Sequence, residues 1–387
     1  LETHAFKELL ADVEQRNLQN NIVGLEASRL FARSEINMGV DAFRDSLYAM
    51  LKRNTFLNIK FENMLDTLGE MSRTDLYSYL KEWEQLTPLP FYSIGEPELT
   101  KVVNKGGEEF FVLKVLVSNN SDYDGIIQMN VLQNGWWYQP MEDPRARKKV
   151  EIAAHTSKEF VSVWEEQIRD VEINTMVSGN LPYMIRQSIG NVKQERNKIV
   201  KDTIYTLPES SLEMPGEVIV DNEDSTLFVL STPAVVGLLP KWLDKVEDTS
   251  FKYSGISWWR APLQWTATTN AKYYGKYIRS AYVIKSGDGS QTATWKIPVP
   301  EAGQYELYYH VFKDDELRWN DRLQGEYHFR VAYDSEMEDA YINLRKANEG
   351  WEQLGTYYFS ADTVRVVLTD ECKLRSVTAD AVKIVKR

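Results

Sequence analysis

The sequence predicts a multidomain α+β protein, with an N-terminal helical subdomain followed by two antiparallel β-sandwiches. Apolar residues repeat at three- and four-residue spacing up to about residue 90 and at every second position in much of the chain after it. These are the periods of an amphipathic helix and of a half-buried strand. The length of 387 residues exceeds what one hydrophobic core usually organises, so two or three domains are expected.

Residues 1–90 are expected to form the helical subdomain. Phe43, Leu47 and Met50 follow the helical spacing and would lie on one face of a helix. A further helix is predicted around SYLKEW at residues 78–83, with Ser72 or Thr74 as its N-cap. Two prolines, at positions 88 and 90, would end it.

Residues 91–190 have the pattern of a small antiparallel sandwich. FFVLKVLVSNN at 110–120 and GIIQMNVLQN at 125–134 flank the polar turn SDYD at 121–124, which is a hairpin signal. The next segment, 191–215, is polar and contains two prolines. We predict that it connects the sandwich to a last domain.

Residues 216–387 are predicted to form a second, jelly-roll-like sandwich. Alternating apolar residues such as Tyr305, Leu307 and Tyr309 indicate strands with one face in a core. The stretch EGWEQLGTYYFSADTVRVVLTD at 349–370 is typical of two strands around a turn. Val364, Val366 and Leu368 would face the core, while Trp351 and Gly355 are interpreted as a turn anchor and a tight bend.

Five motifs in this last domain carry a resemblance to a known family. They are VIVDN (218–222), KYYGKY (272–277), PEAGQYELYYHVF (300–312), EGWEQLGTYYF (349–359) and VTADAVKIV (377–385). In this order they resemble the golvesin and xanthan-lyase C-terminal domain, a β-sandwich module of many secreted bacterial enzymes that is thought to bind carbohydrate. The resemblance implies a carbohydrate or polysaccharide partner and a secreted, periplasmic or cell-surface location.

The first 190 residues carry a second resemblance. Helices closing on SYLKEW, a loop ending in proline, and a sandwich closing with NTMVSGNLP (174–182) are similar to the C-terminal part of a gluzincin zinc aminopeptidase. That family binds zinc through an H-E-x-x-H helix. None of the four histidines is followed by glutamate, and no two are three to five residues apart. We therefore expect the catalytic half to lie upstream of Leu1.

Bulk properties and missing motifs restrict the possible functions. The net charge of −12 argues against nucleic acid as a partner, because long-range repulsion opposes the encounter. No apolar run approaches the roughly 18 residues that a membrane span requires. The sequence contains neither a nucleophile elbow nor a phosphate-binding glycine loop. The single cysteine, Cys372, excludes an intrachain disulfide and is expected to be at least half-buried.

Aromatic residues supply the candidate glycan-binding site, because the apolar faces of sugar rings stack on Trp and Tyr while neighbouring polar groups bind hydroxyls. The candidates lie mainly between residues 258 and 277, with one in a polar loop further on. The aromatic candidates are Trp258, Trp259, Trp265, Tyr273, Tyr274, Tyr277 and Trp319, and the basic candidates, which would attract an acidic glycan, are Arg260 and Lys276.

A structural calcium ion is the one cofactor that the sequence suggests. Asp221, Glu223 and Asp224 follow the first predicted strand of the last domain and offer the oxygen ligands that calcium prefers. The alternative is turn chemistry, in which acidic side chains accept hydrogen bonds from their own backbone.

Three functions are compatible with these observations. The leading hypothesis is a non-catalytic region of a secreted, peptidase-like protein whose last domain binds glycans. The second is a polysaccharide-degrading enzyme, with His310, His328 or a nearby tyrosine as the catalytic base, the two histidines being expected on neighbouring strands. The third is a structural module that only packs against the rest of the protein.

Overall fold

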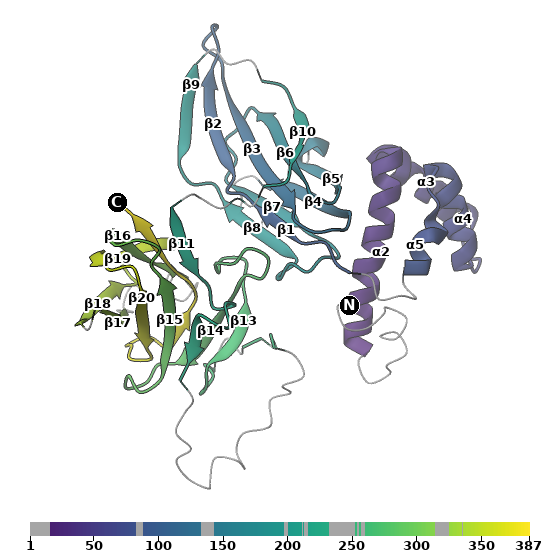
Figure 1. The fold of residues 1–387 in the computed structure, drawn as a ribbon. Coiled ribbons are helices and arrows are strands. Elements are labelled where there is room, and N and C mark those ends of the chain that lie inside the picture. The colour runs from purple at the N-terminus through teal and green to yellow at the C-terminus, as the bar shows by residue number, and fades with distance from the viewer. Residues whose placement is uncertain are drawn as a thin grey trace. The chain divides into compact units, whose positions relative to one another are not determined.

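The computed structural model describes residues 16–82, 88–132, 143–196, 200–210, 212, 216–231, 252–253, 255–256, 260–313, 325–334 and 336–387. The chain divides into two compact units, Leu1–Leu212 and Glu213–Arg387, which run from purple to teal and from green to yellow in Figure 1. As predicted, helices come first and the rest is mainly antiparallel sheet. None of the described helices is long and apolar enough to cross a bilayer.

The helical part of the first unit packs around a small apolar core. Its helices are α2 (Arg16–Met38), α3 (Val40–Arg53), α4 (Phe61–Ser72) and α5 (Leu76–Glu82). Leu30, Phe43 and Leu65 are among the buried residues that they share. The predicted N-cap of the last helix was wrong, because the carboxylate of Asp75 accepts the backbone N–H groups of Tyr77 and Ser78 at 3.1 and 3.2 Å.

The rest of the first unit contains a six-stranded and a four-stranded sheet that contribute to one core. The six-stranded sheet has the order β10 (Thr203–Pro208), β6 (Thr156–Trp164), β3 (Glu109–Asn119), β2 (Glu98–Val103) and β9 (Val192–Arg196), with β1 (Tyr92–Ile94) also paired to β3. The four-stranded sheet has the order β5 (Arg147–Ile152), β4 (Gly125–Leu132), β7 (Asp170–Asn174) and β8 (Met184–Ser188). All pairs are antiparallel except β2 with β9.

Two predictions for this unit were wrong in the same way. The predicted hairpin partners β3 and β4 lie in different sheets. β4 is buried on both faces, and its Ile126 belongs to a buried cluster that also contains Ala32 of α2. The predicted connector, 191–215, contributes β9 and β10 to the six-stranded sheet. In both cases the sequence pattern did not show which strands pair: β4 pairs with β5 and β7, and β9 and β10 pair with β2 and β6.

The described residues of the second unit form three sheets. The first, called here the β16 sheet, has the order β11 (Glu217–Val220), β22 (Val382–Lys386), β16 (Gly303–Val311) and β19 (Gly350–Phe359). The second, the β20 sheet, has the order β12 (Phe228–Leu230), β15 (Thr292–Pro298), β20 (Thr363–Thr369), β17 (Glu326–Tyr333) and β18 (Glu336–Asn343). The third consists of β13 (Thr266–Thr269), β14 (Ser280–Lys285) and β21 (Ser376–Ala379).

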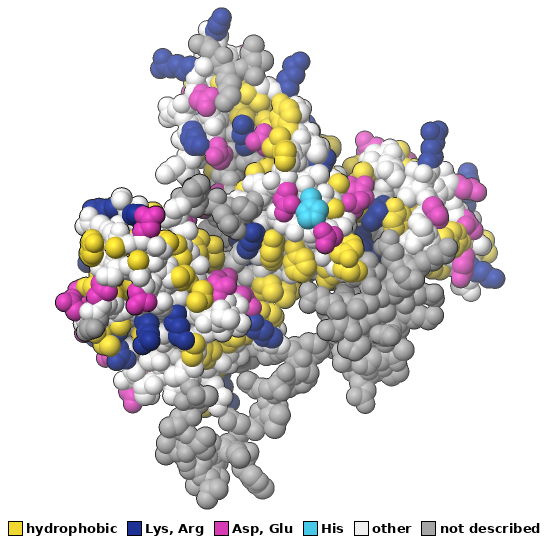
Figure 2. Space-filling model, in the orientation of Figure 1, with side chains coloured by type: hydrophobic (Ala, Val, Ile, Leu, Met, Phe, Trp, Pro, Cys, Tyr) yellow, Lys and Arg dark blue, Asp and Glu magenta, His cyan; other side chains and the backbone are white. Residues whose placement is uncertain are grey.

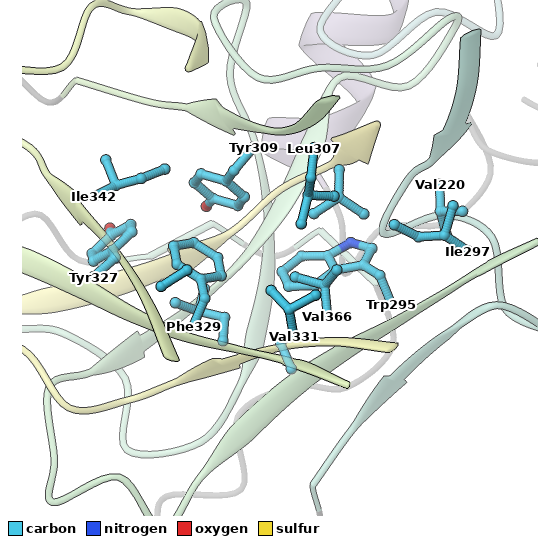
Figure 3. Close-up of a cluster of buried hydrophobic side chains, with 14 of the residues drawn as sticks. Val220, Trp295, Ile297, Leu307, Tyr309, Tyr327, Phe329, Val331, Ile342 and Val366 are labelled. Atoms are coloured by element: carbon cyan, nitrogen blue, oxygen red, sulfur yellow. The ribbon is translucent and has the colours of Figure 1, made fainter. Parts of the chain in front are cut away.

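Alternate residues of the β16 and β20 sheets form one core (Figure 3). Leu307 and Tyr309 of β16 meet Trp295, Phe329 and Val366 of the β20 sheet, and all five are fully buried. This is the alternation that the sequence predicted. Because side chains on a strand point to opposite faces, the residues between these core positions lie on the outer face of each sheet, away from the core.

The stretch at 349–370 forms two strands, as predicted, but they do not pair with each other. β19 belongs to the β16 sheet and β20 to the β20 sheet, so the turn between them crosses from one sheet to the other. Val364, Val366 and Leu368 are in the core as expected. Trp351 is not a turn anchor, since it lies within β19, directly opposite His310 of β16.

Candidate functional site

Three rings meet on the outer face of the β16 sheet. Trp351 and His310 are cross-strand partners, and their ring centroids are 5.1 Å apart in an edge-to-face arrangement. Tyr274, in the loop between β13 and β14, brings a third ring, with its centroid 5.1 Å from that of Trp351 and 5.8 Å from that of His310. These distances are those of favourable aromatic contacts. We call these three residues the aromatic cluster.

A buried carboxylate holds the cluster in place. Asp380, between β21 and β22, is completely buried. One of its oxygens lies 2.9 Å from His310 Nδ1, and the two oxygens accept the backbone N–H of Tyr274 at 3.1 and 3.2 Å. Burial raises the pKa of the Asp380 carboxyl, and the charge and hydrogen bond of His310 oppose that rise. Asp380 thus fixes both the orientation of the imidazole and the path of the Tyr274 loop.

Charged groups border the aromatic cluster. The Lys383 ammonium lies 4.9 Å from the centroid of the Trp351 ring and 5.4 Å from that of Tyr308, within cation–π range. The same ammonium is 2.8 Å from a carboxylate oxygen of Glu217 on β11. A donor and an acceptor therefore stand beside the rings, as a ligand rich in hydroxyl groups requires.

The chemistry of the cluster favours binding. His310 engages Asp380 through Nδ1, and its Nε2 makes no hydrogen bond with the described residues. In the described part of the chain, no Ser, Thr or Cys side chain hydrogen-bonds this imidazole. The rings and the charged pair instead offer stacking and directional hydrogen bonds.

The structure brings one of the predicted aromatic residues into the cluster, Tyr274. Tyr273 is only 5% exposed and packs edge-on against Phe312 with a centroid distance of 4.7 Å, so it belongs to the interior. Trp265 is half-buried against the core, and within the described residues its indole N–H has no hydrogen-bond partner.

The remaining predicted residues lie elsewhere. The Lys276 ammonium is 5.5 Å from the centroid of the half-buried Tyr277 ring, and Arg260 is exposed. Trp258, Trp259 and Trp319 lie outside the described residues.

Sequence reasoning missed Trp351, Asp380 and Lys383 as site residues. Their motifs were recognised, and the alternation of β22 was a usable signal for Lys383, because it puts that residue on the face opposite the core. In β19, strict alternation would put Trp351 on the same face as the core residues Tyr357 and Phe359, and only the register shift next to Gly355 turns Trp351 to the outer face. What the alternation does not give is the strand pairing that brings Trp351 next to His310 and Lys383 next to Tyr308.

The expected proximity of His310 and His328 was wrong. His310 is on β16 and His328 on β17, which belong to different sheets. The His328 ring stacks on Tyr341 with a centroid distance of 4.8 Å, and its Nε2 lies 2.7 Å from Asp339 Oδ1. The two histidines therefore do not form an acid–base pair.

The predicted calcium site is not supported either. Asp224 accepts the backbone N–H of Asp221 at 2.9 Å, which is the turn chemistry considered above. Glu223 accepts the Tyr253 hydroxyl at 2.7 Å and pairs with Lys252 at 2.6 Å. Over the described ranges, no group of three or more His, Cys, Asp or Glu side chains is arranged to hold a metal ion.

Residues 258–386 match the family model described as the Golvesin C-terminal domain, which confirms the resemblance predicted for that segment. The whole aromatic cluster and Asp380 fall within the match, whereas residues 1–190 lie outside it. No curated protein matches the chain in sequence.

Solved structures show weak similarity. One is a Paenibacillus xanthan lyase, with 16% identity and a TM-score of 0.31 over 78% of this chain and 27% of that one. Another is a Bacteroides uniformis β-glucuronidase, with 10% identity and a TM-score of 0.21 over 82% of this chain and 32% of that one. The chain thus spans about a third or less of the length of these proteins.

Proposed function

We propose that the second unit is a carbohydrate-binding module and that the aromatic cluster is its binding site. The observation that carries the proposal is the meeting of Tyr274, His310 and Trp351, from one loop and two strands, around the buried carboxylate of Asp380. The match of this segment to the Golvesin C-terminal domain supports it, since the resemblance implies carbohydrate binding.

In this proposal each group has a separate task. Trp351 and Tyr274 offer ring faces to the apolar side of a sugar. His310 Nε2 bonds a sugar hydroxyl, with Asp380 holding the imidazole in the required orientation. Lys383 and Glu217 provide a donor and an acceptor at the edge. Because these contact residues are already held in place before a sugar binds, less conformational entropy is lost on binding.

The biological role that we propose is targeting. A module of this type would hold an enzyme close to a polysaccharide and raise the effective concentration of its substrate. The peptidase-like character of residues 1–190, a catalytic domain upstream of Leu1 and a secreted or cell-surface location remain predictions of the sequence within this proposal.

Two other functions are distinguishable from binding. The buried Asp380 next to His310 is also an arrangement that would orient a general base in a polysaccharide lyase. Lyase activity would be detected as an unsaturated, ultraviolet-absorbing product that disappears in His310→Ala. A packing role would make Trp351 important for stability alone.

The test is Trp351→Ala in the full chain, screened on an array of neutral glycans. We expect at least a tenfold loss of affinity for the glycan that the wild type binds, because the main stacking face is removed, with the fold retained in circular dichroism and thermal melts. Tyr205→Ala is the matched control, since Tyr205 is an aromatic residue on β10 that is 50% exposed. Unchanged binding by Trp351→Ala, or loss of binding only together with loss of the fold, would overturn the proposal.

A further inference from the structure

Three basic side chains stand together on the outer face of the β20 sheet. Lys296 of β15 is directly opposite Arg365 of β20. Arg330 of β17 is opposite Val367, two residues along β20 from Arg365. We call these three residues the cationic row. Figure 2 shows Lys and Arg side chains side by side over β15 and β20, whose ribbons are labelled in Figure 1.

The side chains of the cationic row are not neutralised by ion pairs within the part of the chain that the structure describes. None of its three side chains takes part in an ion pair or hydrogen bond with the described residues, and Arg330 Nε is buried without a partner. Some other basic residues of this unit are paired, as Lys383 is with Glu217 and Arg387 with Glu306. The chain has 57 acidic and 45 basic residues, so unpaired cations are not a consequence of its composition.

Stability does not explain the row. Like charges directly opposite each other on a sheet are destabilising, and Lys296 faces Arg365 in this way. Asp339 is the residue opposite Arg330, yet its carboxylate lies 2.7 Å from His328 instead. An anionic ligand would supply the missing charges.

An exposed aromatic ring lies on the same face. Tyr341 of β18 is 55% exposed and is the cross-strand partner of His328. The two rings are nearly parallel, at 9°, so His328 supports one face of Tyr341. The outer face of the β20 sheet therefore combines cations with a stacking surface.

We propose that this face binds an acidic polysaccharide, with carboxylates of the ligand at Lys296, Arg365 and Arg330 and a sugar ring on Tyr341. The row crosses three adjacent strands, which is roughly 10 Å at the usual strand spacing and comparable to the length of a disaccharide. This surface is distinct from the aromatic cluster, because it lies on the β20 sheet and consists of different residues.

A polysaccharide fits better than a nucleic acid. Double-stranded DNA carries one charge per roughly 1.7 Å of its axis, and a chain of net charge −12 with three local cations would repel most of that charge. A uronic-acid polymer carries at most one carboxylate on each sugar, and its rings can use Tyr341.

The test measures binding of the full chain to polygalacturonate at low salt, by affinity electrophoresis. Lys296→Gln with Arg365→Gln should weaken binding at least tenfold and flatten its dependence on salt, because two charge contacts are lost. Removing two facing like charges should leave the thermal melting temperature unchanged or higher, so loss of binding is not attributable to unfolding. The matched control is Lys105→Gln with Lys201→Gln, two exposed lysines of the first unit with the same change in charge.

Three outcomes of this experiment would overturn the proposal. Binding by the double variant equal to that of the wild type overturns the inference, as does equal loss in the control variant. Competition by double-stranded DNA at equal mass would also overturn it, in favour of a nucleic-acid surface. Trp351→Ala should still bind polygalacturonate through the cationic row, so failure of the aromatic cluster as a glycan site is separable from failure of this proposal.

Discussion

His155 connects two distant segments of the first unit. Its Nε2 lies 2.8 Å from Asp122 in the turn after β3, and its Nδ1 lies 2.7 Å from Glu209, just after β10. The residue has a positive φ of 53°, which is uncommon outside Gly, although Asn, Asp and His adopt it more often than other residues. The hydrogen bonds to Asp122 and then to Glu209 raise the pKa of the imidazole, so the charged form is favoured in the folded state.

This geometry predicts a pH-dependent contribution to stability. Because the folded pKa is raised, the stabilisation is fully present below the ordinary histidine pKa of about 6.5 and is lost as pH rises through the raised value. His155→Asn removes the charge and keeps a residue that tolerates positive φ. We expect the melting temperature of the variant to fall below that of the wild type at acidic pH and to converge with it at alkaline pH.

Melting curves of both proteins across this pH range check the prediction. Asp122→Asn should reproduce part of the effect, because it removes the first of the two partners. Parallel pH profiles for wild type and His155→Asn would show that the bridge contributes nothing to stability.

The backbone conformation of the loop between β13 and β14 requires a glycine at position 275. Gly275 has φ of 150°, and a Cβ at this position would lie 1.9 Å from the backbone oxygen of Ile278. The preceding residue is Tyr274, which supplies a ring of the aromatic cluster and an N–H to Asp380. The conformation of this short loop therefore determines whether the cluster can form.

Gly275→Ala should damage both stability and glycan binding. The added methyl group meets backbone, which moves less easily than a side chain, so we expect a loss of about 1–3 kcal/mol in the free energy of unfolding together with weaker binding. Urea denaturation and the glycan assay measure the two effects. Gly216→Ala is the matched control, since Gly216 also has positive φ, 87°, but a Cβ there meets nothing within 4 Å.

In the control, Gly216→Ala, backbone strain alone should lower the free energy of unfolding, and glycan binding should be unchanged. If the two alanine variants are equally stable and bind equally well, the close approach at Gly275 does not position the Tyr274 loop.

At the level of the whole molecule, each unit has its own core. The buried cluster of the β16 and β20 sheets draws all its residues from Glu213–Arg387, and the clusters of the helices and of the first two sheets draw theirs from Leu1–Leu212. A unit with an independent core is able to fold alone.

We therefore expect residues 213–387, expressed alone, to unfold in one cooperative transition and to retain the glycan binding of the full chain. Its melting temperature should lie within about 4 °C of the corresponding transition in the full chain, which for a domain of this size means a difference of about 1 kcal/mol or less. Differential scanning calorimetry measures both. A fragment without a cooperative transition would contradict the independence of the unit.

The sequence by itself determined the types of element and the choice of core residues. The change of period near residue 90 separated helices from strands, and alternation placed Leu307, Tyr309 and Val366 in the interior. These properties are local, because each depends on residues a few positions apart. The motifs of the last domain were equally local, and they were sufficient to identify the family that matches residues 258–386.

Only the tertiary structure decided which strands are neighbours. The turns after β3 and β19 each lead into a different sheet instead of a hairpin, and Trp351 meets His310 and Tyr274 although about 40 and 80 positions separate them along the chain. The cationic row likewise depends on the register of three strands. Alternation gives the face on which a side chain lies, but strand pairing and register are set by packing between distant segments, and that packing determined both proposed binding surfaces.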